Sequence, residues 1–261
     1  MADASGATAA VGTEAATRVA DVLLTFTKGP AALGVTEIAR ELGLSKAVVH
    51  RILQSLATRS LVRADAGTRE YRLGPGAIAL GARAMRDFDL RLAAQPTLRR
   101  MRDITKETTT LSARLQDSRI YLDQYESPQE IKMTVELGRP YPLYAGASSR
   151  AILAFLAEET IERVISRGLE RLTPETIRSP RELRRRLAES RATGYAISKG
   201  ERQSAAGSVA APVFGIDGDV VGSISVCGPV DRFDDATITR YVPIVASGAA
   251  EISRALTWQE S

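Results

Sequence analysis

The chain has 261 residues, of which 44% are apolar and 25% are charged, and its net charge is +4 with a sequence pI near 9.4. This balance is typical of a globular protein, and the length suffices for one large domain or two modest ones. The chain contains one cysteine, Cys227, and one histidine, His50. These counts exclude an intramolecular disulfide and the nitrogen and sulfur ligands of a zinc site, and they argue against most hydrolases.

No apolar run approaches the roughly 20 residues that a membrane span needs, and the N-terminus lacks the basic and apolar blocks of a secretory signal. We therefore expect a cytoplasmic protein that does not contact a membrane. Residues 1–13 are expected to be disordered. Neither a metal nor an organic cofactor is expected.

Residues 14–75 begin with three helical patterns. Apolar residues recur at spacings of three and four within residues 14–27 and predict the first helix. Thr36 is placed to cap a short second helix that ends at Gly43, and Ser45 is placed to cap the third. The apolar stripe of the third helix consists of Val49, Ile52, Leu53 and Leu56.

Two short helices joined by a turn that contains glycine are typical of a helix-turn-helix, whose second helix enters the major groove of DNA. Strand patterns on both sides of Gly67 then predict a hairpin, which makes the unit winged. The polar and basic face of the third helix indicates DNA contacts. A solvated face or a protein-docking module is the alternative. The predicted DNA-binding residues are Thr36 and Ser45 for phosphates, Lys46 and Arg51 for guanine or phosphates, His50 and Gln54 for bases, and Arg69 at the wing.

Residues 76–92 carry an apolar stripe at helical spacing, formed by Ile78, Ala82, Met85, Phe88 and Leu92. The pattern predicts a linker helix that packs either on the neighbouring domain or on a helix of a partner chain.

The C-terminal half mixes helical and strand patterns, which favours an antiparallel sheet in an α+β domain. In chain order we expect a helix with Leu98, Met101 and Ile104 on one face, a hairpin around Asp117, a strand at 130–138, a helix at 148–156, a helix from Ser179 to Gly194, a hairpin at Asp217 and Gly218, and a last helix capped by Asp234.

Two stretches of this half raise the question of a binding site. The small residues that precede the helix at 148–156 could point the amides near Ala147, Ser148 and Ser149 at a carboxylate, although many ordinary helices begin in this way. The four arginines of the Ser179 helix could form a nucleic-acid patch or a solvated face, and we favour the solvated face. They are Arg181, Arg184, Arg185 and Arg186.

Five stretches, in this order, resemble the IclR family of bacterial transcriptional regulators. They are "VTEIARELGLSKAVVHRILQSLATRSLVR", "YRLGPGAIALG", "GRPYPLYAGASSRAILA", "GYAISKGE" and "VVGSISVCGP". The resemblance implies a winged helix-turn-helix at 14–75, a linker helix at 76–92 that supports a dimer, and a GAF-like effector-binding domain at 93–261. The dimer would bind a pseudo-palindromic operator.

The family's metabolite contacts correspond to seven positions here, which are Ala147, Ser148, Ser198, Ala206, Ser208, Ser225 and Cys227. Family members often have an acidic residue at Ser198, glycine at Ala147 and cysteine at Ser208. The serines favour a small carboxylic acid or a hydroxylated aromatic acid as the effector. For Cys227 we expect a buried thiol without a redox role.

The resulting hypothesis is a regulator that binds double-stranded DNA, as a dimer or as a tetramer of two dimers, and responds to a small acid. Repression and activation remain open at this stage. One alternative is a DNA-binding protein whose second half only oligomerises. The other is an enzyme that acts on a small acid.

Overall fold

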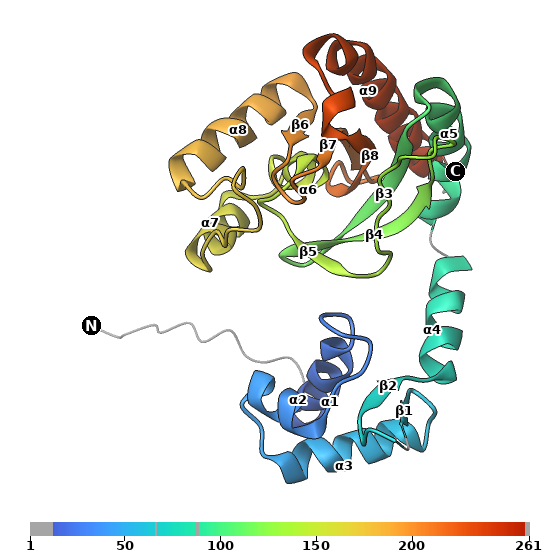
Figure 1. The fold of residues 1–261 in the computed structure, drawn as a ribbon, viewed down its shortest axis with the longest axis vertical. Helices are drawn as coiled ribbons and strands as arrows, with labels where there is room; N and C mark the ends of the chain where they lie inside the picture. The colour runs from blue at the N-terminus through green and yellow to red at the C-terminus, as the bar shows by residue number, and fades with distance from the viewer. Residues whose placement is uncertain (1–12, 66, 87–88, 259–261) are drawn as a thin grey trace. The chain divides into compact units, whose positions relative to one another are not determined.

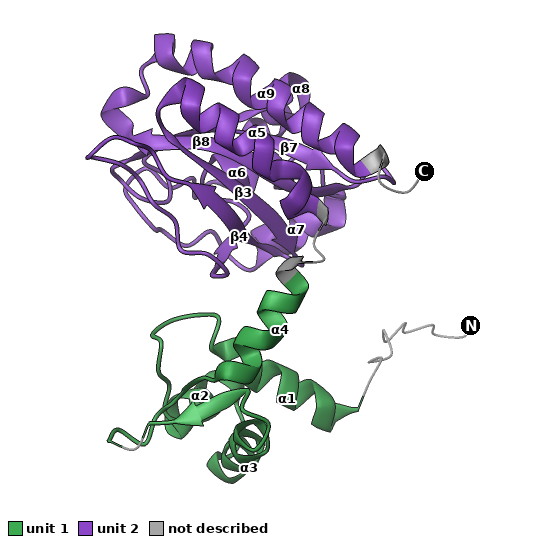
Figure 2. Ribbon diagram, turned by 90° about the vertical axis from the view of Figure 1, so that its right-hand side faces the viewer, with its two compact units in different colours: residues 1–87 green, residues 88–261 purple. Residues whose placement is uncertain are grey.

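The computed structural model describes residues 13–65, 67–86 and 89–258, and it divides into two compact units, 1–87 and 88–261 (Figure 2). The tail expected at 1–13 lies outside the described residues except for Thr13, which caps the first helix. None of the helices in the described ranges is long and apolar enough to cross a bilayer. These ranges also contain no group of three or more His, Cys, Asp or Glu side chains that could hold a metal ion.

Unit 1 contains the three helices and the hairpin that the sequence predicts (Figure 1). Its elements are α1 Glu14–Thr25, α2 Val35–Leu42, α3 Lys46–Ala57, β1 Val62–Ala64, β2 Tyr71–Leu73 and α4 Pro75–Arg86. Gly43 ends α2 with φ of 64°, and the Ser45 hydroxyl caps α3 by accepting from the Val48 amide at 3.3 Å. The cap predicted at Thr36 is wrong, because the N-cap of α2 is Gly34, two residues earlier, and Thr36 lies inside the first turn of the helix.

The core of unit 1 forms where α1, α2 and α3 meet the hairpin. The predicted stripe of α3 is buried, and Val22 of α1 and Ile38 of α2 pack against it. Each such side chain contributes about 1.5–3 kcal/mol on burial. Strands β1 and β2 pair antiparallel, with Val62 opposite Leu73, so the unit is a winged helix-turn-helix.

The linker region differs from the expectation in its boundary. Helix α4 is described to Arg86, and α5 runs from Asp89 to Thr105, so the domain limit expected at residue 92 falls inside α5. The limit fails because the first turns of α5 already bury Leu90 and Ala94 in unit 2. The side chains of Met85 and Phe88 lie outside the described residues.

Unit 2 is built on an antiparallel sheet with strand order β5-β4-β3-β8-β7-β6. Helices α5 and α9 cover one face, and α6 covers the other together with α8 (Figures 1 and 2). This arrangement confirms the α+β class and the antiparallel sheet. The bounds are β3 Thr108–Leu115, β4 Ser118–Tyr125, β5 Pro140–Pro142, α6 Ala147–Leu153, α7 Glu158–Ser166, α8 Pro180–Thr193, β6 Ala196–Lys199, β7 Ala206–Phe214, β8 Val220–Pro229, a 3-10 turn Val230–Arg232 and α9 Asp235–Trp258.

Several local signals are confirmed in unit 2. Ser179 caps α8, which ends at Gly194 with φ of 79°, and the Asp234 carboxylate caps α9 by accepting from the Thr237 amide at 2.8 Å. Gly218 turns the chain between β7 and β8. The prediction that Ile104 shares a buried helix face with Leu98 and Met101 is wrong. Ile104 is 59% exposed, whereas Leu98 and Met101 are buried.

The strand expected at 130–138 does not form, apart from one bridge between Leu137 and Tyr121. Side chains bind the backbone of this segment instead. The Thr108 hydroxyl donates to the Met133 carbonyl at 2.7 Å. The side-chain amide of Gln124 donates to the Val135 carbonyl and accepts from the Val135 backbone amide. An irregular segment is stable here because these bonds replace strand pairing.

Candidate DNA-binding surface and ligand cavity

The seven residues predicted to contact DNA are all exposed in unit 1. Lys46, His50 and Gln54 follow one another at intervals of four on α3, so they share the helix face opposite the buried stripe. Thr36, His50 and Arg69 line one hollow between the start of α2, α3 and the wing.

Asp65 organises the tip of the wing. Its Oδ1 accepts hydrogen bonds from the Gly67 amide at 3.0 Å and the Thr68 amide at 3.3 Å, which form a local turn. These bonds, with a smaller effect of Arg72, lower the pKa of the Asp65 carboxyl. The Arg69 amide also donates to the Asp65 carbonyl at 3.1 Å, and the backbone of Arg69 is left-handed with φ of 59°.

Three of the four arginines of α8 have acidic partners, which agrees with a solvated face rather than a nucleic-acid patch. Arg184 pairs with Glu158 and Glu162 of α7, whereas Arg185 and Arg186 pair with Glu182 and Glu189 within α8. Their charges are therefore compensated locally.

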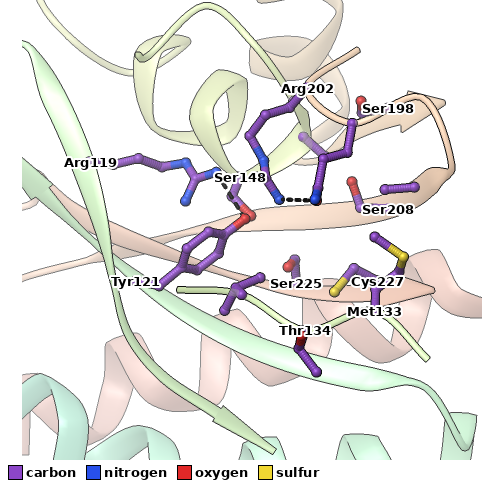
Figure 3. A pocket seen from close by; sticks show the side chains of 15 residues that line it. Arg119, Tyr121, Met133, Thr134, Ser148, Ser198, Arg202, Ser208, Ser225 and Cys227 are labelled. Carbon is purple, nitrogen blue, oxygen red and sulfur yellow. Dashed lines mark hydrogen bonds between the residues drawn. The ribbon is translucent and has the colours of Figure 1, made fainter. Parts of the chain in front are cut away.

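The seven positions predicted for a ligand line one cavity of about 30 Å³ on the α6 face of the unit 2 sheet (Figure 3). Register explains part of this assembly, because Ser208 of β7 pairs with Ser198 of β6 on one side and with Cys227 of β8 on the other. Met133 and its neighbours from the irregular segment 130–138 form another wall. Burial raises the pKa of the Cys227 thiol to about 12, so the group is neutral at pH 7.

Arg119 of β4 is the cavity residue that sequence reasoning missed most seriously. Its side chain is 1% exposed, and its three nitrogens donate to the hydroxyls of Ser149 at 2.8 Å, Ser112 at 3.1 Å and Tyr121 at 2.9 Å. Figure 3 shows the bond to Tyr121. Burial, and secondarily the charge of Arg202, lower the pKa of this guanidinium. Arginine nevertheless stays protonated at pH 7, so the cavity wall carries a buried positive charge.

Arg202 is a second missed cation in the cavity. It reaches in from the loop between β6 and β7, and its guanidinium carbon lies 4.8 Å from the ring centre of Tyr141 and 5.7 Å from that of Tyr121. Arg119 stacks on the same two rings, at 5.3 Å and 4.2 Å. Among the described residues neither guanidinium forms an ion pair with a carboxylate.

The start of α6 is arranged differently from the predicted carboxylate site. The Glu201 carboxylate accepts from the Gly146 amide at 3.2 Å and pairs with the buried guanidinium of Arg150. The protein's own carboxylate thus already lies at this helix start. The positive groups that face the cavity are the side chains of Arg119 and Arg202.

A winged helix-turn-helix and a cavity-bearing α+β unit in one chain define a DNA-binding regulatory protein. Comparison with known proteins specifies the family. The family model of the IclR helix-turn-helix domain matches residues 15–66. The family model of the bacterial transcriptional regulator IclR C-terminal domain matches residues 82–254. The chain belongs to the IclR family of transcriptional regulators.

Individual relatives agree with this assignment. The chain is 34% identical to the HTH-type transcriptional regulator BhcR of Paracoccus denitrificans, over 85% of this chain and 80% of the relative. A crystal structure of a putative IclR regulator from Silicibacter has a TM-score of 0.86 at 27% identity and covers 93% of this chain and 96% of its own. An IclR homologue from Microbacterium hydrocarbonoxydans complexed with 4-hydroxybenzoate has a TM-score of 0.73 at 26% identity, covering 93% and 99%. Because the family consists of regulators, the enzyme alternative is set aside.

Proposed function

We propose that this protein is a ligand-responsive transcriptional regulator whose unit 1 binds operator DNA and whose unit 2 binds a small acid as effector. The observation that supports an acid as effector is the buried charge of Arg119. This side chain lines the cavity and has no carboxylate partner among the described residues. A buried guanidinium is costly unless an anion compensates it, and a carboxylate fits its planar donors.

The DNA half of the proposal rests on the exposed face of α3 and the wing. Arg51 and Lys46 would contact guanine or phosphates, and His50 and Gln54 would contact bases. Thr36 and Ser45 would contact DNA phosphates, and Arg69 would contact the DNA from the wing. Two observations support these roles: all seven side chains are exposed, and Thr36, His50 and Arg69 line a common hollow. The protein would act in the cytoplasm, where the DNA is.

A dimer is the second part of the DNA proposal. In α4 the side chain of Ile78, a member of the predicted apolar stripe, is 71% exposed, which suits a helix that packs on a partner chain. Two recognition helices would then bind two half-sites, so the operator would be pseudo-palindromic. Two such dimers could associate into a tetramer.

The seven cavity positions would surround the acid, with the serine hydroxyls supplying hydrogen bonds. The volume of about 30 Å³ favours a small carboxylic acid. An aromatic acid, as in the 4-hydroxybenzoate complex of the Microbacterium relative, would require Arg202 or Met133 to move. The acid can alter DNA binding only if it binds one arrangement of the dimer more tightly than the other.

The test begins with selection of an operator from random DNA, followed by Arg51→Ala. Weaker binding of operator and of random DNA is expected, and unchanged binding of both would contradict the assignment of α3. A thermal-shift screen of small carboxylic and aromatic acids follows, with operator binding measured for each hit. If no acid shifts the melting temperature, the alternative holds and unit 2 only oligomerises. A promoter fusion then distinguishes repression from activation.

A further inference from the structure

The cavity holds two guanidinium groups at two different depths. Arg119 is almost completely buried at the inner wall, whereas Arg202 is half-buried and enters from another element (Figure 3). Both guanidinium carbons lie within 5.3 Å of the ring centre of Tyr141. Both side chains line this cavity, so a short molecule inside it lies within reach of both groups.

The acidic residues next to the cavity do not neutralise these two charges, because each already has a cation of its own. Glu201 pairs with Arg150. Glu107 accepts two hydrogen bonds from Arg232, at 2.5 Å and 2.8 Å. In the described part of the chain the cavity thus keeps two positive charges without a paired carboxylate, and a monoanion would compensate only one of them.

Arg202 also marks the junction between the cavity and a larger outer hollow of about 650 Å³. The two spaces share Arg202, Gln203, Thr134 and Val135 in their linings. The outer hollow adds Tyr141 and the ion pair of Arg139 with Glu136, whose nitrogen and oxygen lie 3.0 Å apart. A ligand that enters from this side passes Arg202 before it reaches Arg119.

We propose that the effector is a short dicarboxylate, with one carboxylate held by Arg119 inside the cavity and the other held by Arg202 at its mouth. The inference rests on the proposed function, which assigns this cavity to the effector. Two separated carboxylates fit better than one phosphate group, because a phosphate concentrates both negative charges at one point whereas the two guanidiniums lie at different depths. Each terminal nitrogen of Arg119 keeps one N–H that Ser112 or Tyr121 does not use, and a carboxylate can accept hydrogen bonds from both.

The experiment measures binding of matched acids to the full-length protein by calorimetry, without DNA. The diacids are oxalate, malonate, succinate and glutarate, and each is paired with the monoacid of the same carbon number, from acetate to pentanoate. We expect at least one diacid to bind about tenfold or more tightly than its monoacid. If no diacid exceeds its monoacid, the inference is overturned.

Variants then assign the second carboxylate to its arginine. Arg202→Gln removes the charge at the mouth and should abolish the preference for the diacid, while the affinity for the monoacid changes by less than about threefold. Arg139→Gln is the matched control, because Arg139 lines the outer hollow but not the inner cavity. It should leave the preference intact. A diacid preference that survives in Arg202→Gln, or is lost equally in Arg139→Gln, contradicts the inference.

The two proposals can fail separately. If a monoacid binds as tightly as every diacid and still changes operator affinity, the dicarboxylate proposal is wrong but the proposal of a ligand-responsive regulator stands. If the protein binds no operator, or if no acid changes its operator affinity, the proposal of a ligand-responsive regulator is wrong. Arg119→Lys keeps a buried cation with fewer donors, so it should weaken both acids of a pair, whereas Arg202→Gln weakens only the diacid.

Discussion

The Glu201 carboxylate and the Arg150 guanidinium form a buried ion pair beside the ligand cavity. Arg150 also donates to the Ile197 carbonyl, and Thr173 and Thr176 donate to the backbone carbonyl of Glu201. These bonds fix the loop between β6 and β7. The loop is the one that carries Arg202 into the cavity, so the ion pair positions a cavity residue without lining the cavity itself.

Glu201→Ala is expected to lower the free energy of unfolding by about 3–5 kcal/mol, because it leaves the Arg150 charge buried without a partner. Glu158→Ala is the control. It removes an exposed partner of Arg184 and should cost less than about 1 kcal/mol. Urea unfolding of both variants decides the matter, and equal losses would show that burial of the pair is energetically unimportant.

Gly222→Ala should destabilise unit 2 by about 1–3 kcal/mol, because a β-carbon there would lie 2.2 Å from the Ser112 carbonyl oxygen on the paired strand β3. A backbone oxygen cannot move aside as a flexible side chain can. Gly81→Ala in α4 meets no atom within 4 Å and should instead stabilise its helix by about 0.5–1 kcal/mol. Thermal unfolding followed by circular dichroism would refute the packing argument if the two variants shifted in the same direction.

Lys46→Ala should reduce the slope of the logarithm of DNA affinity against the logarithm of salt concentration by about 1, because one phosphate contact is lost. Arg186→Ala serves as the comparison, since Arg186 lies on α8 with Glu182 and Glu189 as partners. The salt dependence of DNA affinity for Arg186→Ala should have the same slope as that of the parent protein. Fluorescence anisotropy between 50 and 200 mM salt, about the range over which such contacts are resolved, measures both. A slope unchanged by Lys46→Ala would remove this residue from the interface.

Cys227 should react with iodoacetamide at pH 8 at least about a hundredfold more slowly in the folded protein than in urea, because only the thiolate reacts. Burial raises its pKa to about 12, so the thiolate fraction stays small below that pH and grows as the pH rises towards it. Mass spectrometry of the alkylated protein follows the rate. Equal rates in the folded and unfolded states would show that the cavity does not shield the thiol.

Local patterns in the sequence determined the helix-turn-helix, the wing and most helix ends. Caps such as Ser45 and Ser179 and left-handed glycines such as Gly43 and Gly194 act within a few residues, so neighbouring residues suffice to predict them. The seven cavity positions came from resemblance to the family. The structure brings these positions together in one lining.

The tertiary structure alone decided which charges face the cavity. Arg119, Tyr121 and Asp123 alternate along β4 as a solvent-facing set would, yet Arg119 and Tyr121 lie under α6. A β-bulge after Tyr121 sends Asp123 towards α5, where it pairs with Arg91 at 3.0 Å.

Burial and ion pairing join residues that are far apart in the chain, such as Arg119 with Ser149 and Arg150 with Glu201. Alternation along a strand shows that two faces differ, but it does not show what covers each face. Packing of α6 over the sheet is what turns a polar strand face into a charged cavity wall.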